Sequence, residues 1–441
     1  MTKTRTDSDK ILALLQSENE ANLRLAFELC KSTQYGEQVA EELRKHPLFC
    51  LECGIEMGYF ENLKELDLSA LQLTTLPESI RQLTSLKELD LSHNQLITLP
   101  KGIGQLPCLE TLRLGENQLT TLPKNIGQLP NLESLDLRGN QLAALPESIV
   151  QLAKLEYLDL SNGQLTTLPK NIGQLTNLVS LSLGRNQLTS LPESIGQLAK
   201  LEYLDLSNSQ FITLTNEFPE SIGQLANLKS LDLEWNQLTT LPKYLGQFKS
   251  LESLDLRGNH LVTLPESIVQ LTNLKNLDVS HNQLTALPKN IGQLKNLNKL
   301  RLRENQLATL PECIGQLTSL EELGLSYNKL TSLPESIGQL IDLKSLNLHT
   351  NQLTALPESI GRLKKLKNLY CESNQLTVLC EGVGQLSSLE SLMLQDNQLA
   401  ALPENLRQLK KLKHLFLTGN SVKQVEHKKM RVALRYCDVR F

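Results

Sequence analysis

A 23-residue period runs through most of this chain and constrains its fold more than any other feature. The pattern L-x-x-L-x-L-x-x-N-x-L-x-x-L-P-x-x-I-G-Q-L-x-x has sixteen starts, and fourteen of the fifteen intervals between them are 23 residues long. A repeat of this length predicts a stacked array in which each unit contacts mainly its neighbours. Such an array presents a long surface and rarely a catalytic pocket. The first leucines of the units are Leu63, Leu86, Leu109, Leu132, Leu155, Leu178, Leu201, Leu228, Leu251, Leu274, Leu297, Leu320, Leu343, Leu366, Leu389 and Leu412.

Each unit opens with a segment that predicts a half-buried strand. In the segment 86–91 apolar and polar residues alternate, so the leucines point inward while Glu88 and Asp90 point outward. The strand recurs in the same direction in every unit, which predicts parallel pairing with the rest of each coil as the crossover. Asparagine follows the strand in thirteen of the sixteen units, as Asn94 does. We expect its amide to satisfy backbone groups of adjacent coils.

The second half of each unit predicts a short return segment. Proline stands at one position of fourteen units, after leucine in thirteen of them, and proline suits an irregular return but not a helix interior. The following Ile-Gly-Gln-Leu, as in 103–106, brings two more apolar side chains inward. We therefore expect 3₁₀ or turn segments on the outer side. A narrow outer layer beside a wider strand layer predicts a curved stack, with the parallel sheet on its concave face.

These motifs resemble the leucine-rich repeat proteins of the typical 23-residue class, and the resemblance covers residues 63 to about 425. The L-P-x-x-I-G-x-L variant is similar to bacterial intracellular and Ras-group leucine-rich repeat proteins. The resemblance implies an α/β solenoid shaped as a horseshoe, which binds a protein on its concave face. By analogy alone, it also implies a small GTPase or another signalling protein as the partner.

We divide the chain into three parts. Residues 1–60 lack the period and predict a helical N-terminal cap or a small helical module, with three amphipathic helices around 11–15, 23–30 and 39–43. Residues 61–424 form the solenoid, whose last unit is partial, and residues 425–441 form a cap of one helix and a short strand. Caps are expected because a terminal coil would otherwise expose its leucines. Four extra residues near 215–218 are the one break in the period.

The net charge, the lengths of the apolar runs and the cysteines limit the functions and the cellular compartments that are possible. A net charge of -4 and a pI near 6.1 give no reason to expect nucleic acid or an anionic membrane as a partner. The N-terminus lacks a signal-peptide core and no apolar run is long enough to span a bilayer, so we expect a cytoplasmic protein, and a monomer. Of eight cysteines only Cys50 and Cys53 lie close together, which favours neither a zinc site nor a disulfide framework.

No catalytic or cofactor motif appears. Asp278, Ser280 and His281 have the residue types of a hydrolytic triad, but consecutive residues of one strand cannot arrange a proton relay around a substrate. We therefore expect no enzyme activity, cofactor or metal. The predicted function is a protein-interaction scaffold or signalling regulator. The alternative is a bacterial effector or sensor whose N-terminal helical segment carries the activity.

The outward position between the second and third leucines is aspartate in eight of the first ten units. Stacked strands bring these carboxylates to within about 5 Å of one another, where like charges repel. One interpretation is a default residue copied by duplication. The other is an acidic concave stripe that attracts a basic protein, formed by Asp136, Asp159, Asp205, Asp232, Asp255 and Asp278.

Departures from the repeat give two further candidate sites. In the C-terminal half, large or basic residues of the kind enriched at interface hot spots replace the aspartate or lie near its position. These candidate partner-binding residues are Arg301, Arg303, Tyr327, His349, Tyr370, Met393 and Phe416. Near the four-residue insertion, a loop beside an aromatic cluster of Phe211, Phe218 and Trp235 is the second candidate. Neutral drift and a tolerated insertion are the respective alternatives.

Overall fold

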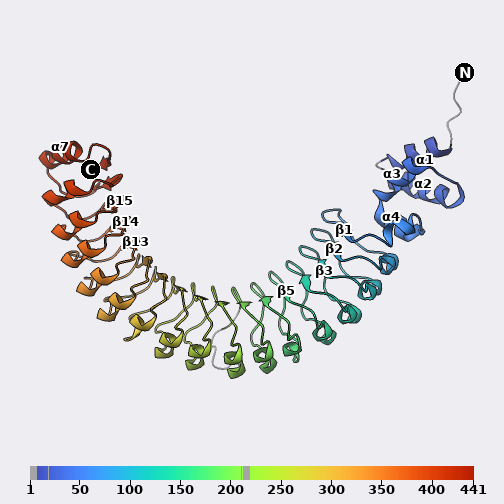
Figure 1. The fold of residues 1–441 in the computed structure, drawn as a ribbon, viewed down its shortest axis with the longest axis horizontal. Helices are drawn as coiled ribbons and strands as arrows, with labels where there is room; N and C mark the ends of the chain where they lie inside the picture. The colour runs from blue at the N-terminus through green and yellow to red at the C-terminus, as the bar shows by residue number, and fades with distance from the viewer. Residues whose placement is uncertain (1–6, 18, 210, 212–218) are drawn as a thin grey trace, which may run out of the picture. The chain divides into compact units, whose positions relative to one another are not determined.

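The computed structural model describes residues 7–17, 19–209, 211 and 219–441. Its chain divides into two units, Met1–Gln187 and Leu188–Phe441, and we describe each by itself. In both units each repeat except the last forms a coil that consists of a short strand, a loop and a 3₁₀ helix (Figure 1). Within each unit the strands lie side by side on one face and the 3₁₀ helices lie on the other, as the repeat pattern predicts.

The N-terminal unit begins with five helices, of which three were predicted. The predicted ones are confirmed as α1 (Asp7–Leu15), α2 (Glu20–Ser32) and α3 (Glu37–Arg44). Two further helices, α4 (Pro47–Cys53) and α5 (Met57–Phe60), were not predicted from the sequence. Two signals delimit α4: proline starts the helix where its missing N–H costs nothing, and Gly54 ends it with a φ of 70°. The ring of Phe27 in α2 stacks on Phe49 in α4, 5.3 Å away, and joins these helices.

The strands are three residues long and pair in parallel with neighbours one repeat away. In the N-terminal unit they are β1 (Glu65–Asp67), β2 (Glu88–Asp90), β3 (Thr111–Arg113), β4 (Ser134–Asp136), β5 (Tyr157–Asp159) and β6 (Ser180–Ser182). The central leucines stand in register, as Leu66 does with Leu89. Their side chains are buried, while the flanking residues face outward.

The C-terminal unit continues the same architecture. Its strands are β7 (Tyr203–Asp205), β8 (Ser230–Asp232), β9 (Ser253–Asp255), β10 (Asn276–Asp278), β11 (Lys299–Arg301), β12 (Glu322–Gly324), β13 (Ser345–Asn347), β14 (Asn368–Tyr370), β15 (Ser391–Met393), β16 (His414–Phe416) and β17 (Asp438–Arg440). A helix, α7 (Gln424–Ala433), precedes β17, and β17 pairs in parallel with β16. A helix and a final strand therefore lie where the sequence places them. None of the helices in the described ranges has the length and apolar character needed to cross a bilayer.

The asparagines after the strands bind the coils together, as predicted. The amide nitrogen of Asn117 donates to the carbonyls of Leu91 and Leu114 at 2.9 and 3.0 Å. Its amide oxygen accepts from the backbone N–H of Leu96 at 3.0 Å. One side chain thereby satisfies backbone groups of two coils that would otherwise be buried without partners. The same arrangement recurs at Asn140, Asn236, Asn259, Asn282, Asn305, Asn328, Asn351, Asn374 and Asn397.

The outer face is built from 3₁₀ helices of two lengths. All of those described have five residues except η5 (Ile172–Gln174) and η10 (Ile291–Gln293), which have three. Each short helix follows a coil that carries valine in place of the usual glycine, Val150 in η4 (Glu147–Gln151) and Val269 in η9 (Glu266–Gln270). At Gly127 of η3 (Lys124–Gln128) a Cβ would lie 2.0 Å from the Ser148 carbonyl oxygen of the next coil. Valine at this position accompanies the shorter helix in the next coil, whereas Arg81 at the same position of Glu78–Gln82 is followed by the five-residue helix Lys101–Gln105.

We expect Gly127→Ala to lower the free energy of unfolding by about 1–3 kcal/mol, because backbone of the next coil must move to admit the methyl group. Thermal unfolding of the variant measures this cost. Gly36→Ala is the matched control, since no atom lies within 4 Å of the Cβ it would add. Equal stability of the two variants would contradict the close contact between coils.

Candidate functional site

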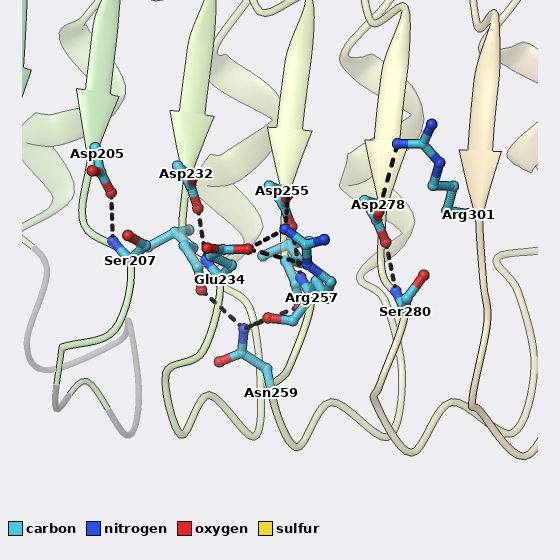
Figure 2. Close-up of polar contacts among 12 residues, drawn as sticks. Asp205, Ser207, Asp232, Glu234, Asp255, Arg257, Asn259, Asp278, Ser280 and Arg301 are labelled. Carbon is cyan, nitrogen blue, oxygen red and sulfur yellow. Dashed lines mark hydrogen bonds and ion pairs between the residues drawn. The ribbon is translucent and has the colours of Figure 1, made fainter. Parts of the chain in front are cut away.

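The aspartates of the acidic stripe have a structural role that the sequence analysis missed. Each carboxylate accepts a hydrogen bond from the backbone N–H two residues later, where the chain leaves the strand (Figure 2). In the C-terminal unit the distances are 2.8 Å for Asp205 and 2.9 Å for Asp232, Asp255 and Asp278. Asp136 and Asp159 do the same in the N-terminal unit. This turn explains why the repeat carries aspartate by default, since short polar side chains stabilise such bends.

Burial of these carboxylates has an electrostatic cost. Burial, with the charges of Asp255 and Asp205 alongside, raises the pKa of Asp232 to about 7. Burial also raises the pKa of Asp255 and of Asp136. At the exposed start of the sheet, hydrogen bonds from the Ser69 hydroxyl and N–H lower the pKa of Asp67. Asp67 and Asp232 both accept the turn hydrogen bond, which favours the charged carboxylate. At Asp232 the loss of solvation in the stacked strands outweighs this hydrogen bond, so the pKa rises instead of falling.

Arginines offset part of this cost. The Arg257 guanidinium donates to Glu234 at 3.1 Å and to Asp255 at 3.4 Å (Figure 2). Oxygens of Asp232, Glu234 and Asp255 lie within 4.8 Å of one another, close enough to surround a metal ion. Arg257 already supplies a cation to two of these three carboxylates. The group is therefore a network of ion pairs, with no feature that calls for a metal.

The structure places the seven C-terminal candidates on two adjoining surfaces of the C-terminal unit. Four of them end consecutive or nearby strands on the sheet face: Arg301, Tyr370, Met393 and Phe416. Arg301 pairs with Glu322 through two hydrogen bonds of 2.9 and 3.1 Å, and it lies 3.9 Å from Asp278. The Arg440 guanidinium lies over the Phe416 ring, 4.6 Å from its centre. The remaining three, Arg303, Tyr327 and His349, lie in the loops after the strands.

These three residues belong to a longer row, which we call the loop row: Trp235, His281, Glu304, Arg303, Tyr327 and His349. The Trp235 and His281 rings are 5.8 Å apart, and Nδ1 of His281 lies 2.7 Å from Glu304. Glu304 also accepts from Arg303, whose guanidinium lies 4.8 Å from the Tyr327 ring. The Tyr327 hydroxyl lies 3.3 Å from Nε2 of His349. Contacts therefore run without a break from Trp235 to His349.

Four members of the loop row stand at a backbone position that turns left-handed in every described coil. The φ angles are 50° at Trp235, 54° at His281, 52° at Glu304 and 57° at Tyr327. Glycine and asparagine adopt this conformation readily, whereas a bulky side chain costs about 1–2 kcal/mol. The left-handed turn directs these side chains away from the core, and Trp235 and Tyr327 are 50% and 40% exposed.

The structure divides the second candidate site. Phe211 is completely buried and belongs to the core, so it cannot join Trp235 in a surface cluster. This corrects the predicted grouping, because an apolar residue of the insertion-bearing coil fills the place of a core leucine. Phe218 and the insertion at 215–218 lie outside the described residues. Trp235 instead contacts the loop row, and the sequence signal for this was its 23-residue spacing from Gly258 and 46-residue spacing from His281.

A hollow of about 360 Å³ opens on the sheet face beside the loop row. Gly324 ends β12 without a side chain, between Arg301 on one neighbouring strand and Asn347 on the other. Arg257 and Arg303 also line the hollow. The sheet face is thus depressed where charged and aromatic side chains converge. A convex protein surface with polar groups fits such a depression better than a flat one.

Comparison with known proteins identifies the architecture. A family model described as a leucine-rich repeat region matches residues 109–186, 168–261, 204–302, 243–329 and 322–437. A second, described as leucine-rich repeats in two copies, matches residues 84–128. Among curated protein sequences, no significant match to this chain was found.

Solved structures agree with the family models. The leucine-rich repeat protein LIC12759 of Leptospira interrogans is 44% identical, with 87% of this chain and 97% of that chain covered and a TM-score of 0.82. The plant peptide hormone receptor RGFR1, in complex with RGF2, is 32% identical over 82% of this chain and 64% of the receptor chain, with a TM-score of 0.63. TLR13, in complex with ssRNA13, is 26% identical over 88% of this chain and 63% of that chain, with a TM-score of 0.67. The chain belongs to the leucine-rich repeat proteins.

Proposed function

We propose that this protein is a non-enzymatic interaction scaffold whose C-terminal unit binds a partner protein along the sheet face and the loop row. The observation that carries the proposal is the continuous chain of contacts from Trp235 to His349. Tryptophan, tyrosine and arginine dominate the energetics of protein interfaces. Here they are held by one another on a rigid array, so binding costs little ordering of side chains.

The N-terminal half of the acidic stripe has a different role in this proposal. Its aspartates form the turns after the strands, which favours the interpretation of a default structural residue. In the C-terminal unit, by contrast, Arg257 joins Asp255 of the stripe to Glu234, which directly precedes Trp235 of the loop row. We therefore propose that Asp205, Asp232, Asp255 and Asp278 add a negative field to one end of the binding surface. Such a field favours a partner with a basic segment.

The relatives suggest the kind of partner and not its identity. RGFR1 is described with a peptide and TLR13 with single-stranded RNA. A protein partner suits this chain better than RNA, because a net charge of -4 repels a phosphate backbone. A small GTPase or another signalling protein remains our proposal by family analogy. We also propose a cytoplasmic monomer. Support for the compartment is that all eight cysteines, each within the described residues, are free thiols.

We assign the N-terminal helices to capping. Helix α4 packs against η1 (Glu78–Gln82), the first 3₁₀ helix of the solenoid. Arg44 of α3 pairs with Glu56 at 2.8 Å and lies over the ring of Tyr59 in α5, which fixes the last helices to the rest. A segment held in this way covers the leucines of the first coil. This favours a cap as the role of the segment and disfavours a separate effector module.

The test is affinity purification of partners from the source cells, followed by binding measurements with the purified partner. We expect the combined variant Arg303→Ala, Tyr327→Ala and His349→Ala to weaken binding at least about thirtyfold, because it removes three contacts of the hot-spot type. Ile341→Ser is the matched control in the same unit: this residue follows η12 (Glu335–Gln339) on the outer face and is 56% exposed. Unchanged affinity of the triple variant would remove the loop row as the site.

A further inference from the structure

An open hollow lies at one end of the loop row. Its volume is about 510 Å³, and its lining includes Trp235, Gly258, His260, His281 and Glu304. These residues come from successive coils at equivalent or adjacent positions. Three aromatic rings and a carboxylate therefore surround one small space on the surface.

The tryptophan is held in place by its neighbours. A Cβ at Gly258 would lie 2.5 Å from atoms Cδ2 and Cε3 of the indole, so the ring lies directly over this glycine. Gly258 has a φ of 68°, which further disfavours any other residue there. The His281 ring, from the coil after that of Gly258, lies 5.8 Å from the ring of Trp235. Trp235 is thus fixed with half of its surface open to solvent.

The histidine presents a hydrogen-bond acceptor. An ionised carboxylate only accepts, so the 2.7 Å contact with Glu304 requires the proton of the neutral His281 ring on Nδ1. Nε2 of the neutral ring is then left as an acceptor. An acceptor next to an open aromatic face suits a ligand that carries both positive charge and N–H donors.

The charged residues around the hollow also favour a positively charged ligand. Glu304 lines the hollow, and Asp232, Glu234 and Asp255 belong to the two coils that carry Trp235 and Gly258, with Arg257 and Arg303 as their ion-pair partners. Because the pKa of Asp232 is raised to about 7, three to four of these carboxyl groups are charged near neutral pH, against two arginines. Both arginines are already engaged, Arg257 with Glu234 and Asp255, and Arg303 with Glu304 and Tyr327. A further cation would be attracted, and an anion repelled.

We propose that this hollow binds an arginine side chain from a basic segment of the partner protein, with the guanidinium stacked on Trp235 and an N–H donated to His281. The inference rests on the proposed function and names the chemistry of one contact within it. Arginine fits better than lysine, because its planar group stacks on the indole while its edge donates hydrogen bonds.

Trp235 is the only tryptophan in the chain, so its fluorescence reports on this hollow alone. The experiment titrates a hexa-arginine peptide into the full-length protein and measures how well acrylamide quenches the tryptophan. We expect the arginine peptide to shield Trp235, hexa-lysine to shield it less, and hexa-glutamate to have no effect. Equal quenching with and without the arginine peptide would overturn the proposal.

A second measurement uses a labelled hexa-arginine peptide and its fluorescence anisotropy. We expect Trp235→Asn to weaken binding about two- to thirtyfold, the range of one cation–π contact, with folding intact because asparagine tolerates the left-handed turn. Tyr157→Ala is the control, an exposed aromatic residue of the N-terminal unit whose loss should change nothing. Equal binding by Trp235→Asn and wild type would show attraction to the acidic stripe alone and sink the proposal. A natural partner that still needs Tyr327 would then leave the proposed function standing.

Discussion

Asn282→Ala should lower the free energy of unfolding by about 3 kcal/mol. The Asn282 amide donates to the carbonyls of Leu256, Val279 and Ser280 at 2.9, 3.1 and 3.1 Å, and its oxygen accepts from the Leu261 N–H at 3.0 Å. Truncation leaves all four backbone groups without this partner in the interior. Each buried group so deprived costs about 1–3 kcal/mol, reduced where neighbouring groups relax.

Thermal unfolding and hydrogen exchange at Leu261 measure the effect. Because a repeat array can unfold in parts, local exchange is the more direct readout. Gln283→Ala is the matched control, since this neighbouring side chain is exposed and its loss should change stability by less than about 0.5 kcal/mol. Asn282→Asp tests the donor alone: its oxygen remains, but the amide that serves three carbonyls is lost. If Asn282→Ala were as stable as Gln283→Ala, the asparagines would not hold the coils together.

The second large effect is expected for Asp232→Asn, whose change in the free energy of unfolding depends on pH. Because the folded-state pKa of Asp232 is raised to about 7, from an unfolded value near 4, folding favours the protonated carboxyl. The wild type therefore loses stability as the pH rises from about 4 to about 7. Asparagine removes this dependence, so the variant should be more stable than wild type at about pH 8. We expect a gain of about 1–2 kcal/mol, less than the full pKa displacement implies, since the side chain is only partly buried and water screens it.

The turn after β8 should survive this change. At the equivalent place in β13, the amide oxygen of Asn347 accepts from the His349 N–H at 3.1 Å. The measurement is the unfolding midpoint of both proteins at about pH 5 and about pH 8. Asp67→Asn is the control, and we expect the opposite change in stability. The pKa of Asp67 is lowered in the folded state, so replacing this carboxylate should slightly destabilise the fold above about pH 4. A variant less stable than wild type at about pH 8 would contradict the account of the acidic stripe.

Much of the fold could be predicted because the same sequence pattern recurs many times along the chain. Alternation in 86–91 gives the strand, the Leu-Pro step gives the 3₁₀ return, and Asn94 gives the contact between coils. The missed helices α4 and α5 lie outside the period, where a single occurrence carries no such redundancy. The short helices η5 and η10 were missed for another reason. A valine in the preceding coil accompanies each of them, but Arg81 at the same position is followed by a five-residue helix, so no single position of the repeat predicts the helix length.

The candidate site was less accessible to sequence reasoning. Departures from the repeat singled out Arg301, Tyr327 and His349. Glu304, by contrast, reads as one more surface carboxylate until the structure places it between His281 and Arg303. Side-chain direction in the left-handed turn decides these contacts, and periodicity does not encode it. Phe211 shows the converse error, because an aromatic residue in a leucine position is core even beside an irregular segment.

The central claim is that a partner protein sits on the loop row of the C-terminal unit, and site-specific photo-crosslinking tests it most directly. A photoreactive phenylalanine analogue placed at Tyr327, which is 40% exposed, should form a covalent adduct with the purified partner. The same analogue at Ile341, exposed on the outer face of the same unit, should form none. Adducts at Ile341 without adducts at Tyr327 would place the partner on the opposite face and contradict the account.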